Sequence, residues 1–88
     1  MSEQVISTKD EVGTYDAIES AKPGQPLFPL QGGDPLAPEC VMLWVNRARD
    51  LARTLPEDDA KRIKLLRKAQ AAEEVAWAMK EYQITGGA

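Results

Sequence analysis

The residues in this chain that are best suited to chemistry are its cations. Five of the eight residues from Lys61 to Lys68 are lysine or arginine, and Arg47, Arg49 and Arg53 come shortly before them. Such groups bind the phosphates of a nucleotide or of nucleic acid. The alternative is a solvated helix face whose charges pair at i, i+4 spacing with Glu57 to Asp59. We favour the solvated face for this basic run.

A second candidate site surrounds Gly32 and Gly33, which precede a predicted helix start. Backbone N–H groups there could cradle a phosphate, but Asp34 would compete for them as a cap, so a simple turn is the better interpretation. Phe28 stands on a proline-stiffened arm and could stack on a ligand base, although packing on a helix is favoured. The predicted ligand-binding residues are Phe28, Gln31, Gly32, Gly33 and Arg47.

The residues needed for catalysis are mostly missing. The chain has no histidine, which excludes Ser–His–Asp and Cys–His schemes. Cys40 is the only thiol; because it borders a predicted buried stripe, we expect a core residue rather than a nucleophile. Helix capping accounts for Glu57 to Asp59, and no acidic loop has calcium or magnesium spacing. We therefore expect no enzyme activity, no cofactor and no metal.

Prolines and glycines organise the first half of the chain. Residues 1–11 are polar and aperiodic and are predicted to be a flexible tail. A short helix is expected over Tyr15 to Ala21, followed by an extended arm in which residues 26–31 could form an edge strand. Asp34 is the predicted N-cap of the next element, with Pro35 in its first turn and one irregular turn possible before the main helix.

The first long helix is predicted over residues 38–54. Its apolar residues recur at helical spacing, with Trp44 as the expected core anchor, and Leu43 falls on another face that the arm or a second subunit would cover. The predicted buried stripe is Val41, Trp44, Val45, Ala48, Leu51, Ala52 and Leu55.

A second helix is predicted over residues 55–85. Thr54 and Glu57 have the spacing of a capping box, and Gly86 with Gly87 would end the helix. Its main stripe is rich in small residues, which would let another helix approach closely: Leu65, Ala69, Ala72, Val75, Ala76 and Met79. A second apolar side implies a second neighbour, so the predicted interface residues are Leu43, Ile63, Leu66 and Trp77.

These elements predict a mainly α fold: a two-helix hairpin with a proline-rich extended N-terminal arm and a short N-terminal helix. Residues 12–88 would form one small domain, and an 88-residue chain buries only a thin core. A lone cysteine cannot form an internal disulfide, so assembly into a homo-oligomer is the expected source of extra stability. The free thiol and the lack of an export signal or membrane-length apolar run predict a cytoplasmic protein.

The segment from Ala21 to Ala48 carries a recognisable pattern of prolines, apolar residues, an aspartate and a tryptophan. It reads Pro23-Gly24-Gln25-Pro26, Leu27-Phe28-Pro29-Leu30, Asp34-Pro35-Leu36-Ala37-Pro38 and then Trp44. This pattern resembles a group of small, mostly uncharacterised proteins encoded by tailed phages and prophages. Pro29 departs from the pattern because it interrupts the apolar stretch. The resemblance implies an accessory phage gene product that acts in a bacterial host cell, and it implies no particular activity.

Two functional classes fit a small phage accessory protein without catalytic residues. The first is an oligomeric sponge that sequesters a nucleotide-type immune signal of the host and so counters its defence. The second is a protein–protein inhibitor or adaptor that binds a host defence or regulatory protein through a patch containing Ile63, Leu66 and Trp77. Nucleic-acid binding by the Lys61–Lys68 run ranks third because the net charge is −3, and an enzyme ranks last.

Overall fold

The computed structural model describes residues 21–86. The chain divides into two units, Met1–Leu30 and Gln31–Ala88. Within the described residues the fold is mainly α, with two helices and no strand. The predicted tail at 1–11, and all but the last residue of the predicted helix at 15–21, lie outside the described residues.

The described part of the first unit begins with a tight turn. The amide of Gln25 donates to the carbonyl of Lys22 at 3.0 Å, and Gly24 between them has a φ of +80°. Proline at the second position and a positive-φ glycine at the third are the signature of a type II turn. The chain then runs without regular structure to Leu30, so the possible edge strand at 26–31 is not formed.

The helix α2 spans Ala37–Arg53, close to the predicted 38–54. The carboxylate of Asp34 accepts a hydrogen bond from the amide of Leu36 at 2.9 Å, and its carbonyl accepts one from Ala37 at 3.0 Å. Asp34 therefore caps the irregular turn before the helix, while Leu36 occupies the N-cap position without a side-chain bond. The predicted arrangement is confirmed, with one irregular turn between the Asp34 cap and the main helix, because the two prolines nearby are accommodated in successive turns.

The helix α3 spans Ala60–Ile84 and begins five residues later than predicted. Thr54 closes α2 instead of opening α3, since its hydroxyl donates to the carbonyl of Leu51 at 2.6 Å. The N-cap is Asp59, whose carboxylate accepts from the amide of Lys61 at 2.8 Å. The predicted capping box at Thr54 and Glu57 was wrong for a geometric reason: a helix starting at residue 55 would leave no loop in which the chain could reverse.

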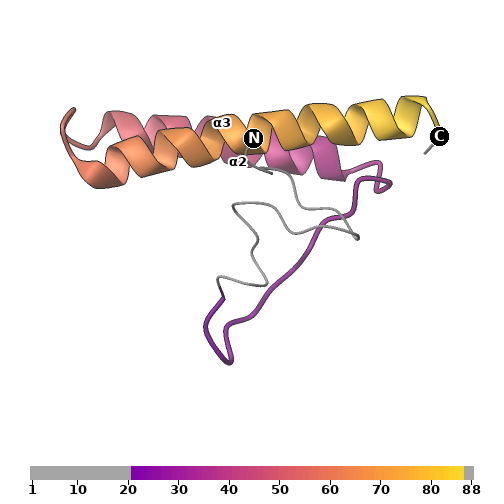
Figure 1. The fold of residues 1–88 in the computed structure, drawn as a ribbon, viewed down its shortest axis with the longest axis horizontal. Helices are drawn as coiled ribbons and strands as arrows, with labels where there is room; N and C mark the ends of the chain where they lie inside the picture. The colour runs from indigo at the N-terminus through magenta and orange to yellow at the C-terminus, as the bar shows by residue number, and fades with distance from the viewer. Residues whose placement is uncertain (1–20, 87–88) are drawn as a thin grey trace, which may run out of the picture. The chain divides into compact units, whose positions relative to one another are not determined.

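The two helices pack antiparallel, side by side along their length, with the connecting loop at one end (Figure 1). Their shared core is made of small side chains, with Val45, Ala48 and Ala69 at its centre. Val45 is the largest side chain that is fully buried. The predicted stripe of α3 is confirmed, since Ala69, Ala76 and Met79 are buried and its other members are half-buried: Leu65, Ala72 and Val75.

Three residues assigned to the core of α2 lie outside it. Trp44 is 39% exposed, Leu51 is exposed, and so is Cys40, which was predicted to be a core thiol. Alanine-lined helices approach closely, which leaves no room for an indole between them. The Trp44 ring lies instead beneath the ammonium group of Lys68, 5.6 Å from the ring centroid. The buried part of the stripe is narrower than its spacing suggested: Val45, Ala48 and Ala52, with Val41 half-buried.

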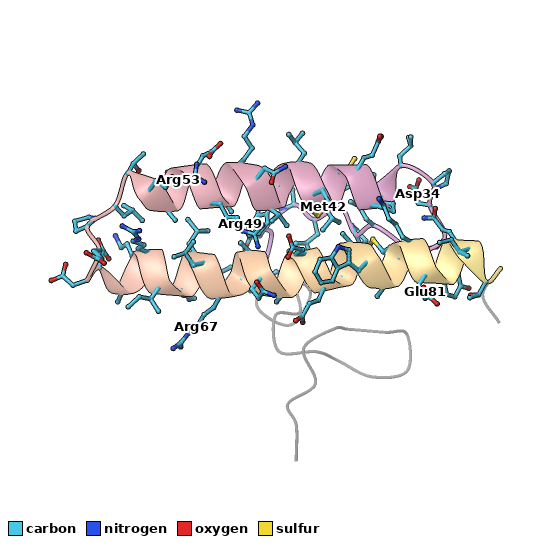
Figure 2. All side chains as sticks on the ribbon, turned by 90° about the horizontal axis from the view of Figure 1, so that it is seen from above. Asp34, Met42, Arg49, Arg53, Arg67 and Glu81 are labelled. Carbon is cyan, nitrogen blue, oxygen red and sulfur yellow. The ribbon has the colours of Figure 1, made fainter. Side chains whose placement is uncertain are left out.

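Polar bonds fix the alignment of the hairpin at two places. The amide nitrogen of the Gln83 side chain donates to the carbonyls of Gly32 at 3.0 Å and Asp34 at 2.8 Å. Near the middle, Arg49 of α2 forms an ion pair of 3.0 Å with Glu73 of α3, and Arg49 points toward α3 in Figure 2. Among residues 21–86 no helix is long and apolar enough to cross a membrane.

Candidate functional site

The Gly32–Gly33 turn is tied into the hairpin. A Cβ placed on Gly32 would lie 3.8 Å from Cγ of Met79, and one placed on Gly33 would lie 3.7 Å from the ring of Tyr82. Both glycines thus lie against the C-terminal end of α3. The amides that follow are also engaged, because Asp34 donates to the Gln31 carbonyl while Leu36 and Ala37 donate to Asp34. The turn is formed as predicted, and the structure also gives it a packing role against α3.

Among the other predicted ligand residues of the second unit, Arg47 lies away from that turn. Arg47 is exposed on α2 and lies ten residues beyond Ala37, which is about 15 Å along the helix axis. Phe28 is exposed and belongs to the first unit. Gln31 is exposed beside the turn. Within one chain the structure brings Gln31 together with the two glycines and leaves Arg47 apart from them.

The basic run divides between different faces of α3. Arg67 projects away from α2 (Figure 2), and Arg62 donates to the carbonyl of Leu55 at 3.2 Å. The three lysines of the run instead line an open groove of about 420 Å³ between the helices near the connecting loop. We call this feature the lysine groove; it is formed by Leu51, Leu55, Leu65, Lys61, Lys64 and Lys68.

The charge pairs predicted for the basic run do not form. Glu57 and Asp58 precede the start of α3 at Ala60, so they share no helix with Lys61 and Arg62, which lie four residues on. The ion pairs among the described residues are Arg49–Glu73 and Arg53–Asp50, and neither includes a lysine of the groove. The lysines are exposed along one edge of an apolar surface, with Lys68 also lying over Trp44.

The start of α3 has an unfavourable charge arrangement. Its first turn carries Lys61 and Arg62 and no acidic residue, although the N-terminus of a helix is the positive end of its dipole. A cation at that end costs about 0.3–1 kcal/mol where it is exposed. The Asp59 cap offsets part of this cost. Departures from a local rule of this kind are typical of functional positions.

A second surface lies on another flank of α3. Ile63, Leu66 and Trp77 follow one face of the helix, since they are separated by three and eleven residues, and all three are exposed. We call these three residues the Trp77 stripe. Gln70 is exposed on the same face between them. Leu43 is not part of this surface: it lies on α2, about 200° around the helix from the buried Val45.

The predicted interface therefore consists of three residues on one face of α3, with Trp77 about 16.5 Å along the axis from Leu66, and one separate residue on α2. Sequence reasoning found the stripe from its spacing on α3. It missed the lysine groove because Trp44 and Leu51 had been placed in the core and the acidic loop residues had been placed inside the helix. The spacing of Lys61, Lys64 and Lys68, at i, i+3 and i+7, was the signal that could have revealed it.

Neither surface has the composition of a catalytic centre. Within residues 21–86 no group of His, Cys, Asp or Glu is placed to hold a metal ion. What the two surfaces offer is an apolar stripe with a large aromatic and an apolar groove edged with cations, which are binding chemistries. Comparisons with protein-family models, with curated proteins and with solved structures find no match for this chain.

Proposed function

We propose that this protein is a non-enzymatic adaptor or inhibitor that docks a partner protein on the Trp77 stripe. One observation carries the proposal: the hairpin has a core of mostly small residues and leaves most of its large apolar side chains exposed. Val45 is the largest fully buried side chain, whereas Trp77 is 57% exposed, and Ile63 and Leu66 are exposed on the same face of α3, about 21 and 16.5 Å toward its N-terminus. In a monomer that works alone, the largest apolar side chains are expected in the core.

The composition of the stripe suits a protein interface. Tryptophan is among the residues that contribute most to binding at interfaces, because it combines a large apolar area with few rotatable bonds. Ile63 and Leu66 add apolar surface on the N-terminal side of the tryptophan. The sequence resemblance to phage accessory proteins suggests that the partner is a protein of the bacterial host.

Capture of a nucleotide-type signal has less support from the geometry. The Gly32–Gly33 turn packs on α3, and Arg47 lies about 15 Å farther along α2. One chain therefore does not assemble the predicted ligand site, and a sponge would need two chains to combine these residues.

A site-specific photo-cross-linker at Gln70 tests the proposal. This position lies on the stripe face, and a probe there leaves Ile63, Leu66 and Trp77 unchanged. We expect covalent adducts with a second, different protein in host cells, identified by mass spectrometry. Trp77→Ala should remove these adducts, because truncating a central aromatic commonly costs 2 kcal/mol or more of binding free energy.

Leu43→Ala is the matched control, since Leu43 is 58% exposed and Trp77 is 57% exposed. Adducts should persist in this variant. Equal loss in both variants would overturn the assignment of the stripe. Adducts between copies of this chain alone would replace the adaptor function with self-association.

A further inference from the structure

The lysine groove has two features that point to a ligand. Its apolar side chains come from both helices and from the loop, and Leu51 is left exposed where α2 ends. Its cations stand along one edge, all on α3, at positions 61, 64 and 68. An exposed apolar floor favours a ligand with an apolar face, and a row of lysines favours negative charge beside that face.

The groove lysines stand at positions that the helix dipole does not stabilise. Lys61 lies in the first turn of α3, where the helix dipole disfavours a cation. The ion pairs of residues 21–86 do not include the groove lysines. A positive row maintained against the dipole is explained by a negatively charged partner.

We propose that the lysine groove binds an acidic amphipathic helix of another protein as a third helix laid between α2 and α3. From Lys61 to Lys68 the rim extends about 10.5 Å along α3. Carboxylates at i, i+4 and i+7 of an incoming antiparallel helix have the same spacing and total length. The apolar face of that helix would cover Leu51, Leu55 and Leu65, as in other complexes in which a helix occupies a groove.

The groove favours a helix over other anions. Three leucines form the floor of the groove. A nucleic-acid backbone is bound through charged and polar groups and would make no favourable contact with this apolar surface. A folded helix presents apolar and acidic residues on adjacent faces, which matches the side-by-side arrangement of leucines and lysines here.

This site is separate from the Trp77 stripe. Lys68 and Trp77 are nine residues apart on α3, which places them about 180° apart around its axis. Binding at the groove can therefore succeed or fail independently of the adaptor function proposed above.

The test uses the full-length protein and fluorescent helical peptides, followed by fluorescence anisotropy. The acidic probe carries leucines on one face and glutamates at i, i+4 and i+7; a scrambled peptide of the same composition is its control. We expect the amphipathic probe to bind and the scrambled peptide to bind at least about tenfold more weakly. Affinity should also fall as salt is raised, because the contacts at the rim are screened.

Two triple variants locate the site. Lys61, Lys64 and Lys68→Gln should weaken probe binding by about tenfold, the sum of three modest exposed charge contacts. The control is Arg53, Arg67 and Lys80→Gln, which removes the same charge from exposed positions that do not line the groove. Circular dichroism establishes that both variants stay helical.

An equal loss in the two variants, equal binding of the scrambled peptide, or no binding of the amphipathic probe would each overturn the proposal. So would tighter binding of single-stranded DNA or of phosphatidylglycerol vesicles that depends on the same three lysines. Retention of Gln70 cross-links in the lysine variant would show that the adaptor function stands independently of this result.

Discussion

The two ends of the hairpin use their polar groups in different ways. At the turn end, where residues 31–36 meet the C-terminus of α3, Gln83 donates to two backbone carbonyls and the glycines pack on side chains of α3. At the loop end, where residues 54–59 join the helices, lysines stand along one edge of an open groove and form no ion pair among the described residues. The polar groups of the turn end are hydrogen-bonded within the hairpin, whereas the loop end leaves lysines and apolar side chains exposed for a partner.

This difference indicates where stability and function are located. Hydrogen bonds at the turn end hold the segment before α2 against α3 and leave few free polar groups for a ligand. The loop end keeps cations at the positive end of a helix dipole, an arrangement that does not help the fold. We therefore expect substitutions at the turn end to lower stability, and one at the loop end to raise it.

The largest change in stability is expected between the two ends, in the alanine core that α2 and α3 share. Ala69 is fully buried between the helices, so Ala69→Leu should push them apart and lower the free energy of unfolding by about 1–3 kcal/mol. Chemical denaturation followed by circular dichroism measures the change. Ala78→Leu, at an exposed position of the same helix, should change stability by less than about 0.5 kcal/mol. Equal effects would show that the helices do not pack closely through these alanines.

The next effect concerns the turn end. Gln83→Ala removes two part-buried hydrogen bonds and leaves the carbonyls of Gly32 and Asp34 without that donor, at a cost of about 1–2 kcal/mol. The amides of Gly32, Gly33, Asp34 and Leu36 should also exchange faster with deuterium, because the turn is no longer held on α3. Gln70→Ala is the control, since Gln70 is exposed on the same helix. Unchanged exchange in the Gln83 variant would show that the turn is held by its packing alone.

At the loop end, two variants distinguish a helix α3 capped by Asp59, as in the structure, from one capped by Thr54, as the sequence predicted. Asp59→Ala should lower stability by about 1 kcal/mol, because it removes the side-chain cap on the Lys61 amide. Glu57→Ala should have little effect, since Glu57 precedes the helix by three residues. A capping box at Thr54 would produce the reverse order, with Glu57 the more sensitive position. Thermal unfolding of the two variants distinguishes these cases.

The sequence predicted the hairpin because the helical periodicity of α2 and α3 is strong and the stripe of α3 is made of small residues. It also predicted the Trp77 stripe, whose spacing separates it from the core. It could not show how narrow the buried strip of α2 is, because Trp44 and Leu51 have the same spacing as true core residues. Only the close approach of the alanine-lined helices decides that these two side chains lie outside.

The loop end was harder to predict for another reason. Thr54 and Asp59 are both good N-cap residues, and each begins a plausible helix. The choice depends on whether the chain has enough residues to reverse direction, which is a property of the whole hairpin. Placing Glu57 and Asp58 inside the helix then supplied the lysines with partners that the structure does not give them. Because those acids lie in the loop, the lysines of the groove have no partner at i, i+4 spacing on α3.

The smallest effect should have the opposite sign. Lys61→Gln removes a cation from the first turn of α3, so it should raise the free energy of unfolding by about 0.3–1 kcal/mol at low salt. The gain should shrink as salt is raised, because the dipole interaction is screened. Lys80→Gln, near the C-terminal end of the same helix, should give no gain, since a cation there is not opposed by the dipole. If Lys61→Gln stabilises the protein while weakening the acidic helical probe, the lysine is retained for binding at the expense of stability. If it destabilises the protein, Lys61 supports the fold, and the contrast between the two ends of the hairpin does not hold.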